Sequence, residues 1–291
     1  MLQLVVAGII WGSLYSLVGV SWGLIYSTTR TFHFAHGLTF TLAAYGVILS
    51  HGFFHFPLFV SFGVGLLVAV SCGCAIEFLV YRPVRRRSSG QLGIFLSAMG
   101  TLVLGESLIQ IFFTPTPRTL EIPDISDIPF SYGTIFFTLA DLLLVLVAWG
   151  IISILELYLS RSKVGREIRA VRSNPELATS VGIRTEKAFL ITFAIGSMLM
   201  GLGSFFVTIQ SAATPHMGLN YVLMAFIATF LGGVGKDWGI ALAGLAMGLV
   251  ENLPLVVLPA HYKYIVVFAL MFGFLLMKPE GLLGARNRVR R

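Results

Sequence analysis

Apolar segments of bilayer-crossing length recur along the whole chain. An α-helix rises about 1.5 Å per residue, so about 20 apolar residues cross a hydrocarbon core of roughly 30 Å. Alternating segments of about ten residues, which a β-barrel needs, are not evident. The pattern predicts an all-α polytopic membrane protein of about eight or nine transmembrane helices, with interrupted segments, forming one domain over residues 1–291. The expected segments are Leu4–Tyr26, Leu38–Leu49, Leu58–Val80, Leu92–Phe113, Thr134–Leu157, Ala188–Gln210, Tyr221–Leu231, Ile240–Val257 and Tyr264–Met277.

Two interruptions lie at similar depth in the two halves of the chain. Ser27–Gly37 is too polar for a lipid-facing helix, and Leu231–Gly239 is too rich in glycine for a simple helix. Irregular backbone at membrane depth is tolerated only inside protein or along a cavity. Paired interruptions of this kind are typical of a translocation path between pseudo-repeats. No clear sequence repeat accompanies them, so two ordinary glycine-containing turns are the alternative.

The first segment carries two pairs of glycines at four-residue spacing, Gly8 with Gly12 and Gly19 with Gly23. Small residues at this spacing allow helices to approach closely in lipid, where helix association depends on packing. The pairs therefore favour a close helix approach along this segment.

Composition and charge agree with a membrane protein. Only 11% of the residues are charged, against about 25% in an average soluble domain. Of the 20 lysines and arginines, 16 lie in Arg82–Arg87, Arg161–Lys187 and Lys278–Arg291. Basic clusters beside transmembrane segments mark the cytoplasmic side, so we expect the N-terminus outside and the C-terminus inside. This distribution favours a determinant of topology in contact with lipid over a nucleic-acid site, despite the net charge of +7.

One carboxylate lies in the middle of an expected span. Glu106 follows Gly105 and lies four residues before Gln110. An intramembrane carboxylate usually faces the bundle interior, a wet cavity or a partner. Glu106 could line a pathway, or it could be a packing residue hydrogen-bonded across helices near Gln110.

Metal and catalytic sites are not expected. His33 and His36 could gate the first interruption or form hydrogen bonds within it, but a metal would need more convergent ligands. Cys72 and Cys74 lie in an apolar segment and are expected to be small buried hydrophobes. The chain carries no phosphate-binding loop and no nucleophile motif, so an enzyme has little support.

The longest polar interval of the chain, Ser160–Lys187, contains the start and stop signals of a short helix. Asn174 can cap the start of a helix, Pro175 suits the first helical position, and Glu176 complements the helix dipole in the first turn. The helix is expected to run to about Val181, with Gly182 as its stop. A solvated interfacial helix without a partner is the alternative to a helix that docks.

This interval resembles the cytoplasmic loop of branched-chain amino acid ABC transporter permeases, and more closely the H-type subunit of the leucine/isoleucine/valine system. The resemblance extends in order over nearly the whole chain. Its motifs are Gly23-Leu24-Ile25-Tyr26, Phe34-Ala35-His36-Gly37, Gly165-Arg166, Arg169-Ala170-Val171, Asn174-Pro175-Glu176, Ala178, Gly182-Ile183, Thr192-Phe193-Ala194-Ile195-Gly196-Ser197, Gly201, Leu231-Gly232-Gly233-Val234-Gly235, Gly248-Leu249-Val250-Glu251 and Lys278-Pro279-Glu280-Gly281-Leu282.

Two departures from the family pattern bear on the amino-acid preference. His33 stands where the family commonly has Asn. Lys236, Asp237 and Trp238 follow the glycine run, where the family usually has small residues.

The resemblance implies an ABC importer permease in the bacterial cytoplasmic (inner) membrane. A homologous second permease subunit would complete the pathway, and two cytoplasmic ATPase subunits would bind ATP and Mg, so this chain carries no cofactor itself. A solute-binding protein would deliver branched-chain amino acids from outside. Urea, short amides and sugars remain alternative substrates, because related permeases share this architecture. A secondary transporter coupled through Glu106 is the alternative outside this architecture.

The resemblance also assigns site residues. Residues 160–187 would form the cytoplasmic loop that carries the coupling helix. Coupling to the ATPase would involve Gly165, Arg169, Asn174, Pro175, Glu176, Ala178 and Gly182. The translocation pathway would include Phe34, Ala35, His36, Gly37, Glu106, Gly232, Gly233 and Gly235.

Overall fold

The structure is a computed structural model of the chain. It describes residues 1–87, 90–120, 129–132 and 135–252, and single positions at 265, 269, 272, 273 and 276. The helices are α1 (Leu2–Thr29), α2 (His36–Ile48), α3 (Leu58–Ala75), α4 (Arg82–Arg86), α5 (Gln91–Phe113), α7 (Leu139–Arg161), α8 (Lys163–Ser173), α9 (Pro175–Ser180), α10 (Thr185–Gln210), α11 (Met217–Gly232) and α12 (Asp237–Asn252), with π-helical turns at Leu49–Phe53 and Ile76–Tyr81.

Five helices are long and apolar enough to cross a membrane within the described residues. This confirms a multi-pass helical membrane protein. A sixth span is obtained only if α11 and α12, which meet at a bend of 120°, are taken as one. The five long spans are Leu2–Thr29, Leu58–Arg86, Gln91–Phe113, Leu139–Arg161 and Thr185–Gln210.

The predicted count of eight or nine spans is not confirmed. The segment predicted at Leu38–Leu49 forms α2, a helix of 13 residues that begins inside the protein. The segments predicted at Tyr221–Leu231 and Ile240–Val257 form α11 and α12, of 16 residues each. Residues 253–257 and nearly all of Tyr264–Met277 lie outside the described residues.

The span predicted from Thr134 begins later than expected. Ile135–Thr138 is strand β2, which pairs antiparallel with β1 (Pro129–Tyr132). The helix α7 starts only after Thr138, because Thr138 and Asp141 form a capping box in which each side chain bonds the backbone N–H of the other. Gln3 fastens the hairpin to α1 through two hydrogen bonds to the backbone of Phe136, at 2.9 and 2.8 Å.

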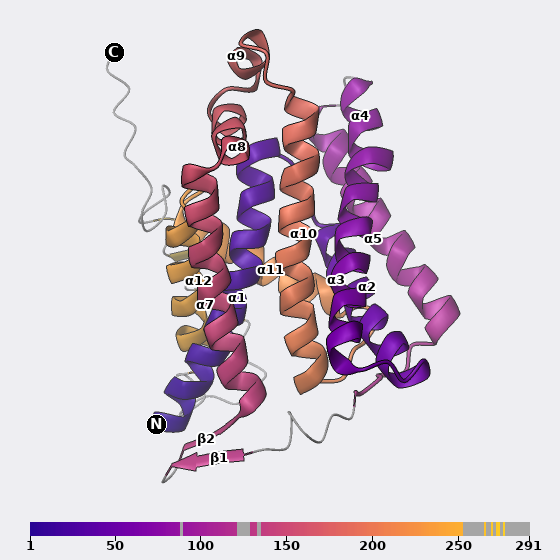
Figure 1. The fold of residues 1–291 in the computed structure, drawn as a ribbon, viewed down its shortest axis with the longest axis vertical. Coiled ribbons are helices and arrows are strands. Elements are labelled where there is room, and N and C mark those ends of the chain that lie inside the picture. Colours follow the sequence, from indigo (N-terminus) through magenta and orange to yellow (C-terminus); the bar gives the residue numbers. More distant parts are fainter. Residues whose placement is uncertain are drawn as a thin grey trace.

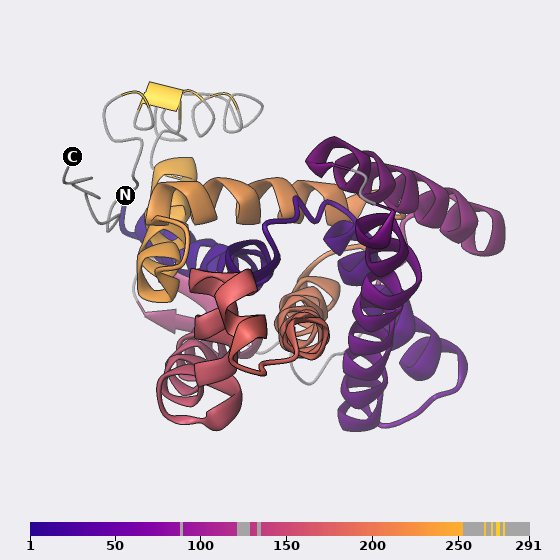
Figure 2. The same cartoon turned by 90° about the horizontal axis from the view of Figure 1, so that it is seen from above.

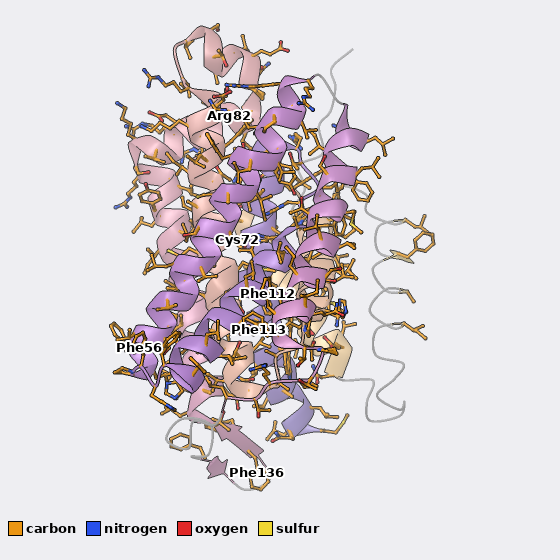
Figure 3. All side chains as sticks on the ribbon, turned by 90° about the vertical axis from the view of Figure 1, so that its right-hand side faces the viewer. Phe56, Cys72, Arg82, Phe112, Phe113 and Phe136 are labelled. Atoms are coloured by element: carbon orange, nitrogen blue, oxygen red, sulfur yellow. The ribbon has the colours of Figure 1, made fainter. Side chains whose placement is uncertain are left out.

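The bundle has two chemically distinct ends. The end that carries α4, α8 and α9, called here the basic end, lies opposite the end with Met1 and the β-hairpin, called the hairpin end (Figure 1). Arg82 marks the basic end and Phe136 the hairpin end in Figure 3. The two described basic clusters therefore share one end, as their charge predicted.

Among the five long spans, α1 and α10 are the most buried. About two thirds of the apolar window of each is buried, 61% and 67%, against 22–28% for the spans that contain α3, α5 and α7. Large apolar side chains such as Phe112 and Ile111 on α5 are mostly exposed. Such a surface would be a liability in water and suits contact with lipid.

Glycines set the distance between α1 and α12. A Cβ atom on Gly12 would lie 2.8 Å from the carbonyl oxygen of Leu245, and one on Gly8 would lie 2.9 Å from the Leu249 side chain. Gly244 and Gly248 of α12 meet the α1 backbone in the same way. The close approach predicted from the glycine pairs is confirmed. Seen down the bundle, α11 runs across it while α10 is viewed along its axis (Figure 2).

Candidate functional site

The loop at the basic end is built as two short helices. Ser162 caps α8, since its hydroxyl accepts a hydrogen bond from the Gly165 N–H at 2.8 Å. Any Cβ atom on Gly165 would collide with the backbone of Leu159, so glycine is what lets α8 fold back against the end of α7. Arg169 fastens this fold by donating to the Ser160 carbonyl at 3.1 Å.

The next helix, α9, starts and stops where the sequence predicts. The Asn174 side-chain oxygen accepts hydrogen bonds from the N–H groups of Glu176 and Leu177, both at 3.0 Å. Pro175 occupies the first turn. Gly182 ends the helix with φ 87°, a left-handed conformation that favours glycine. The N–H of Ile183 then bonds the carbonyl of Ala178 at 3.0 Å.

One face of α9 is seated and the other projects. Ala178 is buried in a small apolar cluster with Val171 of α8 and Ala188 of α10. Leu177 and Val181 are 65% and 74% exposed. Figure 1 shows α9 as the outermost element of the basic end. The helix is thus held on one face, while Leu177 on it and Val181 at its C-cap are exposed apolar side chains.

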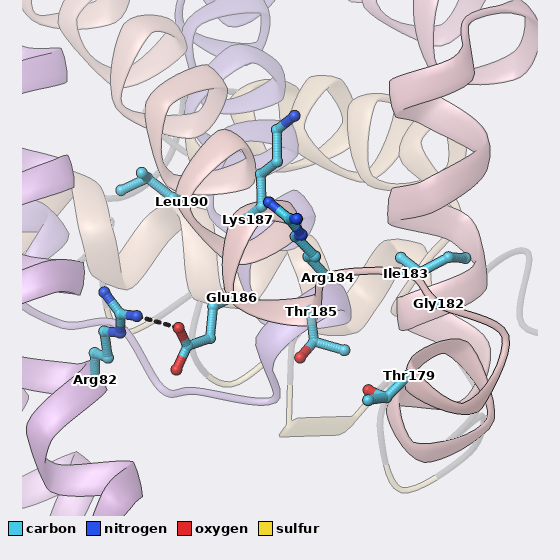
Figure 4. Close-up of a pocket in the computed structure, with 9 residues that line it drawn as sticks. All are labelled: Arg82, Thr179, Gly182, Ile183, Arg184, Thr185, Glu186, Lys187 and Leu190. Carbon is cyan, nitrogen blue, oxygen red and sulfur yellow. Dashed lines mark hydrogen bonds and ion pairs between the residues drawn. The ribbon is translucent and has the colours of Figure 1, made fainter.

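A cavity of about 560 Å³ lies beside α9. Glu186 faces Arg82 across it, whereas Arg184 and Lys187 point away from Glu186 (Figure 4). Arg82 and Arg86 of α4 both pair with Glu186 of α10, Arg86 at 2.9 Å. These exposed pairs link α4 to α10, and each contributes roughly 0–1 kcal/mol.

The first interruption lies between α1 and α2. Arg30, with φ 55°, ends α1, and α2 begins at His36. Ala35, His36 and Gly37 are buried, and Phe34 is partly buried. A Cβ atom on Gly37 would lie 3.0 Å from the carbonyl carbon of Gly218, so the start of α2 meets the start of α11 backbone to backbone.

Hydrogen bonds hold both histidines of the interruption in place. His36 Nε2 bonds Ser21 Oγ at 2.7 Å, and this hydroxyl donates to the Gly196 carbonyl at 2.7 Å. His33 Nδ1 bonds the Tyr81 hydroxyl at 2.7 Å. Both rings are fully buried. In this conformation the histidines hold the interruption against α1, α10 and the π-helical turn Ile76–Tyr81.

Phe34 belongs to an aromatic surface that reaches α11. Its ring lies 6.0 Å from that of Phe226 and 5.7 Å from that of Phe95, centroid to centroid. With Phe32, Gln91 and Leu92 these rings line a cavity of about 400 Å³. Phe32 also stacks with Phe230 at 6.5 Å, so aromatic side chains extend from the first interruption toward the second.

The second interruption is the turn between α11 and α12. Gly233 and Gly235 have φ 98° and 85°, conformations that L side chains rarely adopt. Gly232 packs against the backbone of Gly239 and Ile240, where a Cβ atom would not fit. Glycine at all three positions is therefore what permits the bend of 120°.

Glu106 pairs with a residue that the sequence did not single out. Its Oε2 atom lies 2.7 Å from Nδ1 of His216, and Gln110 Nε2 lies 2.9 Å from Nε2 of the same ring. Glu106 is buried whereas the His216 side chain is 64% exposed. The pair joins α5 to the residue before α11. The only local signal was the position of His216 between Pro215 and the next apolar segment.

Comparison with known proteins identifies the family. The family model described as the permease component of the branched-chain amino acid transport system matches residues 4–275. The chain belongs to this family. It is 29% identical to the high-affinity branched-chain amino acid transport system permease protein LivH of Escherichia coli K12, over 97% of this chain and 95% of LivH. It is 27% identical, with the same coverage, to BraD of Pseudomonas aeruginosa.

A solved structure supports the fold of this permease. The chain resembles one chain of PsaBC from Streptococcus pneumoniae with a TM-score of 0.52 and 12% identity, over 94% of this chain and 91% of the other. At this identity the likeness concerns the fold alone.

Proposed function

We propose that this chain is one transmembrane subunit of an ATP-driven importer for branched-chain amino acids and forms half of its translocation path. The observation that carries the proposal is α9, a helix with a cap at each end that projects two apolar side chains from the basic end. The family membership of residues 4–275 supports the same function.

The complete importer would contain further subunits beside this chain. A homologous second permease would complete the path, and two ATPase subunits would bind ATP and Mg at the basic end. That end would face the cytoplasm, because basic loops are retained inside. A solute-binding protein would dock at the hairpin end. The membrane would be the cytoplasmic membrane of a bacterium.

ATP binding would act on this chain through α9. The exposed Leu177 and Val181 would enter a groove on the ATPase, and the residues of the two caps would keep α9 from unwinding under load. Because Ala178 is packed between Val171 and Ala188, a displacement of α9 would pass into α8 and α10. Coupling would thus use Gly165, Arg169, Asn174, Pro175, Glu176, Ala178 and Gly182.

The path would run along the two interruptions. Aromatic rings at Phe34, Phe226 and Phe230 suit aliphatic side chains by shape and weak contact, which allows release. Affinity would come from the solute-binding protein, because tight binding in the path would slow transport. The path would include Ala35, His36, Gly37, Glu106, Gly232, Gly233 and Gly235 beside Phe34.

Reconstitution tests this function. The chain is placed in proteoliposomes with its second permease, its ATPases and its solute-binding protein, and uptake of labelled leucine is measured with and without ATP. We expect uptake only in the complete mixture with ATP, and competition by isoleucine and valine but not by urea. Uptake driven by an ion gradient with this chain alone would instead identify a secondary transporter.

A further inference from the structure

One arginine of α8 contacts the turn between α11 and α12. Arg172 lies in the last turn of α8, and its Nη1 donates to the Gly235 carbonyl at 3.2 Å. The same nitrogen lies 3.7 Å from Oδ2 of Asp237, the first residue of α12. The side chains of Arg172 and Asp237 are only 14% and 6% exposed. A pair this buried constrains geometry, because separating it leaves an uncompensated charge.

The helix that carries Arg172 is packed on both α9 and the bundle core. Val171, next to Arg172, is fully buried and shares a cluster with Ala178 of α9. Ile168 is fully buried in the core cluster that contains Ile240 of α12. A displacement of α9 must therefore move the last turn of α8, and Arg172 with it.

The turn that Arg172 contacts contains two glycines with left-handed backbone and borders a cavity. Gly233 and Gly235 provide two adjustable backbone positions, and hinges are built from a few such residues. A cavity of about 330 Å³ lies beside the turn, and Arg172, Asp237 and Trp238 are among the residues that line it. Movement of the turn thus has both backbone freedom and space.

The contact between Arg172 and Asp237 is incomplete in this conformation. A guanidinium carries five donors and can bind a carboxylate through two parallel hydrogen bonds. Among the described residues, Nε and Nη2 of Arg172 and Oδ1 of Asp237 are buried without a hydrogen-bond partner. A closer, two-bond pair would satisfy these atoms, and it requires α8 and the turn to approach each other.

We propose that Arg172 is a positioning residue that transmits the displacement of α9 to the α11–α12 turn. When α8 advances, Arg172 passes from its single bond to Gly235 to a two-bond pair with Asp237, and the turn follows. This inference rests on the proposed function of α9 as the element that the ATPase moves.

Transport by the complete reconstituted importer tests the inference. In Arg172→Lys the charge is kept but the two-bond geometry is lost. We expect the ATP hydrolysed per leucine imported to rise about tenfold, the factor that one hydrogen bond to a charged group can supply.

The exchanged pair Arg172→Asp with Asp237→Arg should recover much of the coupling. Arg166→Lys, at an exposed arginine of α8 that bonds the Arg161 carbonyl, is the matched control and should couple normally.

Wild-type coupling in Arg172→Lys would overturn the inference, because charge compensation alone would then suffice. A proportional loss of hydrolysis and uptake, without recovery in the exchanged pair, would also overturn it, since a purely structural residue behaves in that way.

Hydrogen exchange separates this inference from the proposed function. In the complete complex, amide exchange is measured in peptides that cover the turn at residues 232–240. We expect exchange to be about tenfold faster in Arg172→Lys than in wild type, and unchanged in Arg166→Lys. If the wild-type complex shows no ATP-driven uptake, the proposed function fails, yet faster exchange still supports the contact. Unchanged exchange in Arg172→Lys overturns the inference in either case.

Discussion

At the residue scale, the two ends of α9 make the sharpest prediction. Asn174→Ala removes the acceptor of two backbone N–H groups, and losing such a cap costs about 1 kcal/mol. Gly182→Pro demands a negative φ where the chain has 87° and removes a bond to the Thr179 carbonyl. We expect both variants to insert and assemble but to import several-fold less leucine per ATP, as measured in proteoliposomes.

Glu176→Arg acts on the same helix without removing a cap. It places a positive charge at the positive end of the helix dipole, and we expect it to uncouple hydrolysis from uptake as well. Ser180→Ala is the matched control, because Ser180 lies in the last turn of α9 and, among the described residues, its hydroxyl bonds the nearby Leu177 carbonyl. Normal coupling in Glu176→Arg and Gly182→Pro would remove α9 from the coupling pathway.

Hydrogen bonds between residues close in the sequence could be predicted, whereas those between residues far apart in the sequence could not. Asn174 and Gly182 bond groups within four residues, so the sequence alone specifies both ends of α9. Glu106 finds His216 across 110 positions, and Arg172 finds Gly235 across 63. Such pairs exist only once the helices are packed, and one sequence does not show which distant residue is the partner.

At the scale of elements, the approach of α1 to α12 is tested by enlarging one glycine. A Cβ atom on Gly248 would fall on the backbone of Gly12, and overpacking of this kind costs about 1–3 kcal/mol or more. We expect Gly248→Ala to lower the thermal unfolding midpoint of the purified protein in detergent. Gly150→Ala is the matched control, since nothing lies within 4 Å of its added Cβ. Equal midpoints would show that α1 and α12 can separate at little cost.

Element boundaries were predictable where apolar length decides them. The predicted spans that form α1, α5 and α10 are long and apolar enough to cross a membrane, because lipid requires about 20 apolar residues of helix. The prediction was wrong where backbone pairing competes with the apolar pattern. Ile135–Thr138 continues the apolar pattern of the predicted span, yet it forms a strand that pairs with Pro129–Tyr132. The helix α7 therefore begins only at Leu139. The short helices α2, α11 and α12 are likewise stabilised by packing inside the bundle. The length of an apolar segment does not predict such packing.

At the scale of the whole molecule, the separation of the basic end from the hairpin end predicts the orientation in the membrane. Val181, the C-cap of α9, is 74% exposed and Phe130 on β1 is 43% exposed, and α9 and β1 lie at opposite ends of the bundle (Figure 1). Basic loops stay inside. In a background without Cys72 and Cys74, an impermeant maleimide should therefore label Phe130→Cys in intact cells and Val181→Cys only after the membrane is permeabilised.

The same two variants locate the ATPase. If α9 enters a groove on that subunit, assembly of the complete importer should protect Val181→Cys from the reagent while Phe130→Cys stays reactive. Labelling of Val181→Cys in intact cells would invert the orientation and place α9 where no cytoplasmic ATPase could reach it. Equal reactivity of Val181→Cys with and without the ATPase would leave the orientation intact and remove α9 from the contact. The pair of sites thus decides topology and docking separately, because one measurement depends on the bilayer and the other on the partner.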